Sequence, residues 1–533
     1  MTAILAVFAA AFSLYLGSLY PAIAPRDSAD MASAAMTLGV AHPPGYPLYS
    51  ALGRLWLAVF PWGNTAYRLN VLSAVAAAAA VALLFVLVRR RAGPWGGLAA
   101  AALWGGSAPL WKFALLEEKY SLHALFAVAL LALAEGERAT VFQRARVSGL
   151  LLGLGLVNHQ SLLFLAPGMA WLWRDEARRC GAPVSRLAGA AALPLAGGLA
   201  LYVFLWVRLG ALGPALGTVL RARYGAGTLF GGFARPLTPE TGGELLAYAA
   251  RGTAEAVGWA TAAAALIGAA LAWREERSRT AAWLLGAVLT GPVFLVLTRF
   301  DPSNWVARSV LEPAFLLPAL VAAAFAGEAV GALARRGAAL GAAAAVLLPA
   351  AALAARSPLP EHRDDLLAYD YVRDLRRAVP PGGALLAAGD TASFGLRWLA
   401  LAEPEQRPRE VAPSRLVDAS AWLAARAGRD DVFVTGLGLA DLRALGLPSK
   451  ERPLAPAGLV ARVGTRPPVD PPLSVLRRPR AWARDESYAR DAKLSYAFAS
   501  WVSARLLETQ GLTPPEALDL AAAADDPEDY RLQ

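Results

Sequence analysis

Long apolar runs, separated by short polar segments, occupy the first two thirds of the chain. They begin with 2–20 and 71–88 and recur up to residue 355. Unbroken apolar runs of this kind are typical of transmembrane helices, which need ~20 residues to cross a bilayer. The pattern predicts a mainly α-helical, polytopic membrane protein with about eleven membrane-entering helices. We interpret the first run as an uncleaved span and not as a signal peptide.

The last third of the chain has a different pattern. After Arg356 the sequence is charged and punctuated by proline, and strand-like runs alternate with helix-like ones. We therefore expect a transmembrane domain over 1–355 and a soluble α/β domain over 356–533. The predicted elements of the second domain are a helix at 369–379, strands at 384–388, 432–435 and 459–463, and a closing helical hairpin that begins with 488–510.

Arginine clusters between the apolar runs predict the orientation of the spans. The cluster 89–91 follows the second apolar run, and the positive-inside rule places such loops in the cytoplasm. Counting from there puts Asp27, Glu118 and the C-terminal domain on the outer face. The run 147–173 is either one span or a hairpin whose turn is the polar triplet 158–160, and the arginine distribution favours the hairpin.

Composition agrees with a membrane protein, since 56% of the 533 residues are hydrophobic and only 17% are charged. The net charge of +10 comes with arginine clusters beside apolar runs, so no nucleic-acid partner is expected. The single cysteine excludes an internal disulfide framework. No metal-binding spacing or nucleotide-binding loop occurs, and we predict neither a metal site nor a firm cofactor. Abundant Arg, Ala, Gly and Pro with few lysines suggest a bacterium, hence its inner membrane.

One polar segment, PRDSADMASAAMTLGVAHPPGYP at 25–47, follows the first apolar run. Asp27 and Asp30 are spaced as a helix N-cap and an acid at the third helical position. That interpretation leaves the stretch 42–47 unexplained, whose three prolines fix the backbone. Such stiffness suits a site that holds a group in place. A carboxylate at a membrane surface can act as general base on a hydroxyl while a lipid-linked phosphate departs.

These motifs resemble a known family. The pattern D-S-x-D from Asp27, with G-V-A-H-P-P-G-Y-P-L after it, resembles the protein O-mannosyltransferase-related membrane family, whose wider superfamily has the GT-C glycosyltransferase fold. The similarity is strongest over 27–167. In this chain Asp30 stands where glutamate is usual, and Arg26 stands where glycine is common. Further matching positions are Arg68, Asn70, Ser73, Glu118 with the Tyr120-Ser121-Leu122 that follows, Asn158-His159-Gln160, and Arg221 with Arg223-Tyr224-Gly225.

The resemblance implies a GT-C-like fold, a catalytic aspartate in the first external loop, a polyprenyl-phosphate sugar donor and a soluble domain on the same side. Carried over by position, Asp27 is the candidate base. Asp30 is a helper that orients the acceptor or raises the pKa of the base, and Glu118 is a second acid. The candidate substrate-binding residues are His42, Tyr46, Asn158, His159, Arg223, Tyr224 and Arg299.

Several of these residues also have simpler interpretations. Glu118, beside Glu117 and Lys119, would ordinarily belong to a solvated ion pair, and His42 to a satisfied turn. An interfacial Tyr46 is more readily a membrane anchor, and we favour that interpretation. His159 differs, because polar groups at membrane depth usually line a cavity.

The sequence therefore predicts an inverting glycosyltransferase that moves a sugar, with mannose as first choice, from a polyprenyl-phosphate donor to an extracytoplasmic acceptor. The acceptor is Ser or Thr of a secreted protein, or another glycan or lipid. The expected partners are the lipid-linked donor, the acceptor and membrane lipid. The alternative is a lipid-glycan transporter or flippase that does not cleave its carrier, although the half-repeats and intramembrane charges of transporters are not evident.

Overall fold

The computed structural model describes residues 1–136, 139–222, 234–355, 361–405, 409–412, 416–429, 431–464 and 490–509. The chain forms two compact units. Unit 1 comprises residues 1–19, 38–62 and 68–363, and unit 2 comprises 20–37, 63–67 and the described residues from 364 onward.

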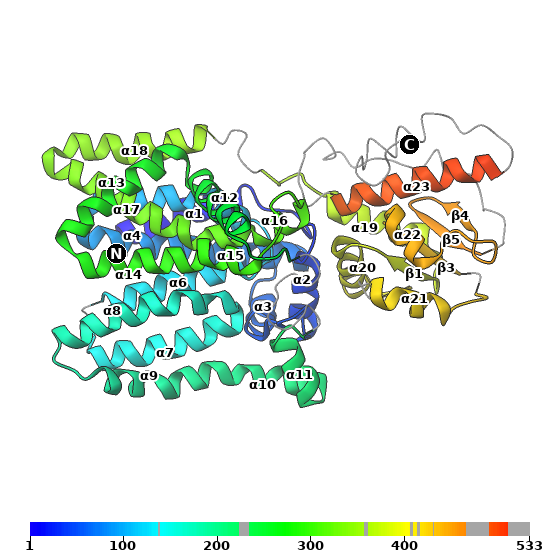
Figure 1. Cartoon of the computed structure of the whole chain (residues 1–533), viewed down its shortest axis with the longest axis horizontal. Helices are drawn as coiled ribbons and strands as arrows, with labels where there is room; N and C mark the ends of the chain where they lie inside the picture. Colours follow the sequence, from blue (N-terminus) through cyan, green and yellow to red (C-terminus); the bar gives the residue numbers. More distant parts are fainter. Residues whose placement is uncertain are drawn as a thin grey trace. The chain divides into compact units, whose positions relative to one another are not determined.

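Unit 1 is helical, as the apolar runs predict (Figure 1). Its longest helix, α4, contains a non-helical residue at Gly93, followed by Pro94, which kinks it. The elements are α1 (Thr2–Leu16), α3 (Pro47–Val59), α4 (Thr65–Gly105), α5 (Ala108–Ala114), α6 (Tyr120–Ala134), α7 (Val141–Asn158), η1 (Gln160–Leu165), α8 (Ala166–Arg179), α9 (Val184–Leu199), η2 (Ala200–Tyr202), α10 (Val203–Leu209), α11 (Leu212–Val219), α12 (Pro239–Val257), α13 (Trp259–Glu275), α14 (Arg277–Val288), η5 (Leu289–Val293), α15 (Phe294–Thr298), α16 (Trp305–Leu311), η6 (Glu312–Phe315), α17 (Leu316–Arg336) and α18 (Ala338–Ala354).

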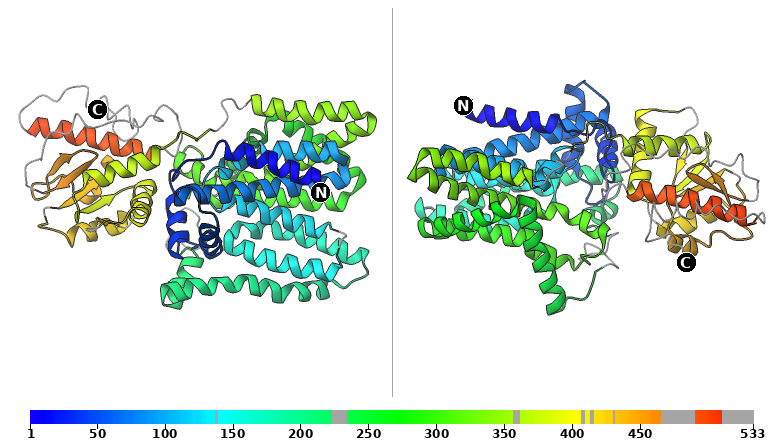
Figure 2. Two further views of the ribbon diagram at one scale, coloured as in Figure 1. Left: turned by 180° about the vertical axis from the view of Figure 1, so that it is seen from behind. Right: turned by 90° about the horizontal axis from the view of Figure 1, so that it is seen from above.

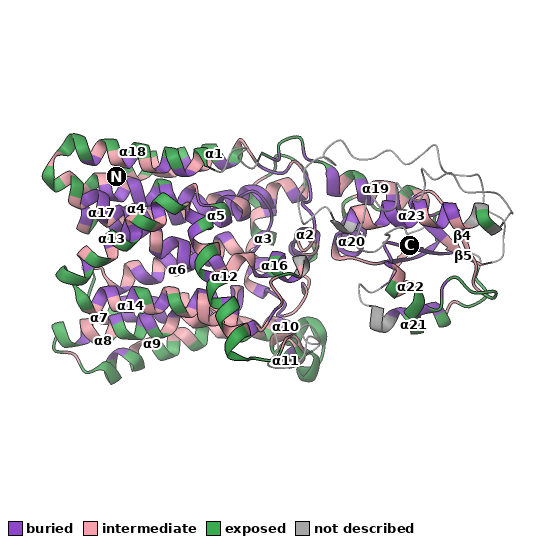
Figure 3. Ribbon diagram, turned by 45° about the horizontal axis from the view of Figure 1, so that its top comes forward, coloured by how far each residue is buried: buried purple, intermediate pink, exposed green. Residues whose placement is uncertain are grey.

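Among the described residues, four helical stretches are long and apolar enough to cross a membrane, or five if α12 and α13, bent by 103°, count as one span. Three shorter apolar helices, α1, α6 and α18, add to them. α17 is mostly buried, whereas α9 and α10 are mostly exposed or partly buried (Figure 3). The exposed apolar residues of α9 and α10 include Leu193 and Val207. Unit 1 thus has the make-up of an integral membrane protein, and the count of about eleven membrane-entering helices stays a prediction.

Helices α6 and α7 form an antiparallel pair that is tied at both ends. At one end the Arg144 guanidinium donates to the carbonyl oxygen of Leu133, at 3.0 Å, and at the other the Asn158 amide donates to that of Lys119, also at 3.0 Å. The interruption predicted at 158–160 is present, because α7 ends at Asn158 and His159 is extended before η1 and α8. The polar triplet is therefore placed at the Lys119 end of the pair.

Close backbone contact fixes α7 against α9. A Cβ added at Gly149 would lie 2.2 Å from the backbone oxygen of Ala191, and one at Gly153 would lie 2.4 Å from that of Leu195. Small residues let membrane helices approach in this way. The helix that ends at the polar triplet is thus held along its length.

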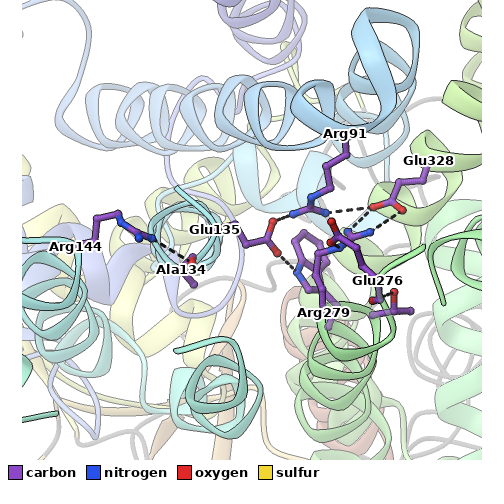
Figure 4. Close-up of polar contacts among 9 residues, drawn as sticks. Arg91, Ala134, Glu135, Arg144, Glu276, Arg279 and Glu328 are labelled. Atoms are coloured by element: carbon purple, nitrogen blue, oxygen red, sulfur yellow. Dashed lines mark hydrogen bonds and ion pairs between the residues drawn. The ribbon is translucent and has the colours of Figure 1, made fainter. Parts of the chain in front are cut away.

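An ion network joins four helices at the other end of the α6–α7 pair (Figure 4). Arg279 of α14 pairs with Glu328 of α17 at 2.7 Å and with Glu276 at 2.6 Å. Arg91 of α4 contacts Glu328 at 3.2 Å and also pairs with Glu135, which follows α6. The side chains of Arg91, Arg279, Glu135 and Glu328 are all at most 18% exposed, so the network lies largely out of water.

Unit 2 contains a five-stranded sheet of order β2-β1-β3-β5-β4. The first three strands in that order are parallel to one another. Strand β5 runs antiparallel to both of its neighbours, β3 and β4. Helix α23 packs beside β4 and β5 (Figure 2). The elements are α2 (Ser28–Thr37), α19 (Leu367–Ala378), β1 (Ala384–Ala387), α20 (Asp390–Ala402), β2 (Glu410–Val411), α21 (Leu416–Ala424), β3 (Val432–Thr435), α22 (Leu439–Leu445), β4 (Leu454–Ala457), β5 (Val460–Val463) and α23 (Arg490–Thr509).

The predicted helix at 369–379 and the strands at 384–388, 432–435 and 459–463 are confirmed as α19, β1, β3 and β5. Strands β2 and β4 were not predicted, because one has two residues and the other contains Pro456. The first helix of the predicted tail hairpin is α23, and the second lies outside the described residues.

The short N-terminal segment 20–37 belongs to unit 2, although the sequence pattern places it within 1–355. Its helix α2 packs against α20. The Asn64 amide also donates to the carbonyl oxygen of Pro21, at 2.7 Å, and the Trp398 indole to the hydroxyl of Thr65, at 3.2 Å. These contacts join residues far apart in sequence, which local periodicity does not reveal.

Removing one carboxylate from the ion network should destabilise unit 1. We expect Glu328→Gln to lower the free energy of unfolding by about 3 kcal/mol, because Arg91 and Arg279 lose a buried anion. The matched control is Glu275→Gln, whose pair with Arg335 is 63% and 55% exposed, and whose loss should cost less than about 1 kcal/mol. Denaturant unfolding in detergent micelles measures both, and equal losses would contradict the buried network.

Candidate active site

The Pro-Pro-Gly-Tyr-Pro segment forms a tight turn that leads into α3. The amide of Gly45 donates to the carbonyl oxygen of His42, at 2.8 Å, and Pro47 is the first residue of the helix. Tyr46 caps the helix with a left-handed backbone, φ 45°. Its side chain is only 3% exposed, so the prediction of a membrane anchor is wrong: the turn directs this ring inward.

The ring of Tyr46 is surrounded by polar side chains. Its centroid lies 5.0 Å from that of His42 and 6.4 Å from that of His159, with the second pair nearly parallel. The ammonium nitrogen of Lys119 lies 4.9 Å from the centre of the same ring. Tyr46 therefore connects the turn after α2 with residues from α6 and the end of α7.

The segment Glu117-Glu118-Lys119 lies between α5 and α6. The simpler interpretation of these residues as a solvated ion pair does not hold, because the three residues are 0%, 7% and 1% exposed. The Lys119 ammonium pairs with a Glu118 oxygen at 2.7 Å and lies 4.7 Å from the ring centre of Tyr120. The loop is short and closed by Ser121, whose hydroxyl donates to the Phe113 carbonyl oxygen at 2.7 Å. An ammonium out of water needs such a partner.

Asn158 and His159 reach the same place from the broken end of α7. Asn158 is fully buried and holds the backbone of Lys119, as described above. His159 Nδ1 is 2.6 Å from the Ser161 hydroxyl, and its ring lies 5.3 Å from that of Tyr120. His159 thus lies beside the aromatic rings of Tyr46 and Tyr120, and the expectation that it lines a cavity stays a prediction.

We call His42, Tyr46, Glu118, Lys119, Tyr120, Asn158 and His159 the buried polar cluster. Lys119 and His123 were missed as site residues. The ring of His123 lies 5.1 Å from that of His159, and it stands one turn after Lys119 on α6. That spacing of four residues was a signal available in the sequence.

Asp27 and Asp30 lie in unit 2, at the start of α2. The carbonyl oxygen of Asp27 accepts from the amides of Asp30 and Met31, both at 3.0 Å, and α2 begins at Ser28. Asp27 therefore occupies the N-cap position, and Asp30 is the third helical residue, as their spacing predicts. Both side chains are half-buried. Their proposed chemical roles rest on the motif.

The remaining predicted residues are placed differently. Arg223 and Tyr224 lie outside the described residues. Arg299 ends α15 with a left-handed backbone, and its carbonyl oxygen accepts from the amide of Arg235 at 2.8 Å. In the following loop, hydrogen bonds from Ser303 lower the pKa of Asp301. Within the described ranges, no group of three or more His, Cys, Asp or Glu side chains is arranged to hold a metal ion.

Comparison with known proteins places these residues in a family context. Residues 27–177 match the family model of the N-terminal domain of protein O-mannosyl-transferase TMEM260. Protein O-mannosyl-transferase TMEM260 of Mus musculus is 36% identical over 174 residues, which are 31% of this chain and 25% of that protein. The corresponding protein of Dictyostelium discoideum is 26% identical over 188 residues, 32% of this chain and 23% of that protein. The match thus spans about a quarter of each relative.

The fold is similar to two solved structures of ArnT from Cupriavidus metallidurans. The structure bound to undecaprenyl phosphate has a TM-score of 0.54 at 12% identity, covering 87% of this chain and 97% of that chain. The apo structure has a TM-score of 0.52 at 13% identity, covering 87% and 96%. The matched domain confirms the resemblance of the N-terminal part to an O-mannosyltransferase-like family, and the structures show that the fold is like that of ArnT.

Neutralising one member of the Glu118–Lys119 pair should lower the free energy of unfolding more than neutralising both members. We expect Glu118→Gln to lower the free energy of unfolding by about 3 kcal/mol, because Lys119 is left buried without its anion. The double variant Glu118→Gln/Lys119→Gln should recover most of that loss. As a control, Glu312→Gln breaks a pair with Lys112 that is 30% and 25% exposed and should cost about 1 kcal/mol or less. If the double variant loses as much free energy of unfolding as the two single variants together, Glu118 and Lys119 do not stabilise each other as a pair.

Proposed function

Because the N-terminal part of the chain is similar to the O-mannosyltransferase-like family and its fold to that of ArnT, we propose that this protein is an inverting glycosyltransferase. It transfers a sugar, with mannose as first choice, from a polyprenyl-phosphate donor to a hydroxyl group. The acceptor is a Ser or Thr side chain of a protein, or another glycan or lipid.

The observation that carries the proposal is the Lys119 ammonium, held out of water between two tyrosine rings and one carboxylate. A polyprenyl-phosphate sugar combines an apolar tail, a phosphodiester anion and a sugar ring. Binding it requires apolar helices, a cation in a low-dielectric site and flat side chains. The buried polar cluster supplies the cation and the rings, and α3, α6 and α7 supply the apolar surroundings.

In the proposed reaction, the acceptor hydroxyl loses its proton to Asp27 as its oxygen attacks the anomeric carbon of the sugar. The bond between that carbon and the phosphate oxygen breaks on the opposite face, and its electron pair leaves with the polyprenyl phosphate. One substitution of this kind inverts the configuration at the sugar. Lys119 counters the charge that grows on the departing phosphate, which is where a fixed cation lowers the barrier most.

The other candidates have supporting roles in this proposal. Asn158 fixes the backbone of Lys119, and thereby its ammonium. His42 and His159, whose rings lie 5.0 and 6.4 Å from that of Tyr46, contact hydroxyl groups of the sugar in this proposal. Asp30 orients the acceptor or raises the pKa of Asp27, and Glu118 balances the charge of Lys119. Arg223, Tyr224 and Arg299 remain proposed donor contacts from the motif alone.

We further propose that the reaction takes place on the extracytoplasmic side of a bacterial inner membrane, where the arginine distribution places Asp27 and Glu118. Unit 2 then lies on that side too, near acceptors in the same compartment. The arginine distribution in the sequence is the basis for this orientation. Cysteines introduced at positions 27 and 118 test it, because an impermeant thiol reagent added from outside should label both.

Asp27→Asn tests the proposed base. The amide cannot accept the acceptor proton, so transfer from polyprenyl-phosphate mannose should fall by about 10²- to 10⁴-fold in proteoliposomes. Asp374→Asn is the matched control in the same unit, because its pair with Arg377 is exposed and carries no proposed role. Wild-type transfer rates in a well-folded Asp27→Asn variant would remove Asp27 from the mechanism.

The same assay separates the proposal from a flippase. A transferase releases free polyprenyl phosphate in the amount of sugar that appears on the acceptor. A flippase moves the labelled carrier across the bilayer and leaves its phosphate–sugar bond intact. Carrier movement without released polyprenyl phosphate would contradict the transferase.

A further inference from the structure

We propose that Thr391, in the C-terminal α/β part of unit 2, is a positioning residue for Asp27. The inference rests on the proposed role of Asp27 as the base. The backbone amide of Arg26 donates a hydrogen bond to the Thr391 hydroxyl, at 2.8 Å, across 365 residues of sequence. Thr391 is 2% exposed and is the second residue of α20. The residue before the candidate base is thus held by a buried side chain of the same unit, 365 residues away in the sequence.

The backbone at Arg26 explains why such a hold is needed. Its φ is 72°, in the left-handed region that residues with a Cβ avoid. Strained residues persist only where the surrounding structure over-determines them. Here the Thr391 hydroxyl fixes the Arg26 amide on one side, and α2 fixes the next residue on the other, through the Asp27 carbonyl. The direction in which the Asp27 side chain leaves the backbone depends on both.

The surrounding contacts make α20 a scaffold for the whole turn. Helix α2 packs along α20, and a Cβ added at Gly395 would lie 3.5 Å from the Ile23 side chain, so the two segments are in close contact. The amide of Ala24 donates to the Ser28 hydroxyl at 2.9 Å, which closes the turn on itself. The Thr391 hydroxyl adds a hydrogen bond to the backbone amide of the strained residue itself.

This arrangement gives the C-terminal domain a part in catalysis without contact to the reacting atoms. A general base must lie within hydrogen-bond reach of the proton it removes. A displacement of ~1 Å at a reacting group lowers rates by up to ~100-fold. Loss of the Thr391 hydroxyl should therefore lower kcat while leaving donor binding nearly unchanged.

The experiment compares three variants of the full chain in proteoliposomes. Thr391→Val keeps the shape but removes the acceptor, and we expect kcat to fall by about 10- to 100-fold with the KM for polyprenyl-phosphate mannose within about 3-fold. Thr391→Ser keeps a hydroxyl and should restore most of kcat. Ser393→Ala is the matched control: its hydroxyl bonds the Ala387 carbonyl oxygen at 3.0 Å inside the domain, so its loss should leave kcat within about 3-fold of the unchanged protein.

A second substitution distinguishes positioning from general damage. Glycine enters the left-handed region without a steric cost, so Arg26→Gly relieves the strain that the Thr391 bond opposes. Arg26→Gly/Thr391→Val should therefore lose clearly less kcat than Thr391→Val alone. If Thr391 only stabilises the domain, the glycine will give no rescue, and that result overturns the inference.

Hydrogen exchange gives a readout that does not depend on transfer. Amides of residues 26–31 should exchange faster in Thr391→Val than in Ser393→Ala, while those of β1 and β3 stay protected in both. Unchanged exchange at 26–31 with unchanged kcat overturns the inference and leaves Asp27 as base intact. By contrast, if Asp27→Asn keeps full transfer, the proposed function itself fails, whatever Thr391→Val does.

Discussion

The constraint on which unit 1 depends is the burial of the Glu118–Lys119 ion pair. Two opposite charges 2.7 Å apart lie almost entirely out of water, in a loop between two apolar helices. The desolvation of such a pair is costly, and it is offset only when geometry and further contacts are good. The rings of Tyr46 and Tyr120 lie against the ammonium, and the Asn158 amide donates to the backbone carbonyl oxygen of the same lysine. Contacts of Lys119 thus join the turn after α2, the start of α6 and the end of α7.

A second buried charge cluster lies at the far end of the same helices. α6 has 15 residues between Lys119 and Glu135, so the two clusters are separated by about 22 Å of helix. The cluster of Arg91, Arg279 and Glu328 satisfies each guanidinium with carboxylates from neighbouring helices. The buried polar cluster instead gathers a lysine, two histidines and several rings around few carboxylates. We interpret the first as a structural tie between helices and the second as the site of the cation that the proposed function assigns to the donor phosphate.

The local sequence pattern predicts those helices and strands that depend on neighbouring residues alone. Strands β1, β3 and β5 follow apolar runs bounded by glycine or proline, and the break at 158–160 follows from polar residues inside an apolar run. The capping position of Asp27 follows from its spacing with Asp30. Burial was harder to predict. The local sequence suggests a solvated ion pair for Glu118 and Lys119, and a position at the membrane interface for Tyr46. Their burial results from tertiary contacts with Asn158 and His159, which no local window contains.

The placement of residues 20–37 with the C-terminal part of the chain was least predictable, since its contacts span hundreds of residues. One residue nevertheless carried a hint. The resemblance implies that glycine is common at the position of Arg26, and the structure gives that position a φ of 72°, which glycine adopts freely and arginine does not. An arginine in this conformation needs a contact from elsewhere in the chain that fixes its backbone. Thr391 supplies it from α20. The left-handed backbone at Arg26 and the long-range hydrogen bond are therefore two parts of one arrangement, in which a distant segment of the same unit holds the backbone beside the candidate base.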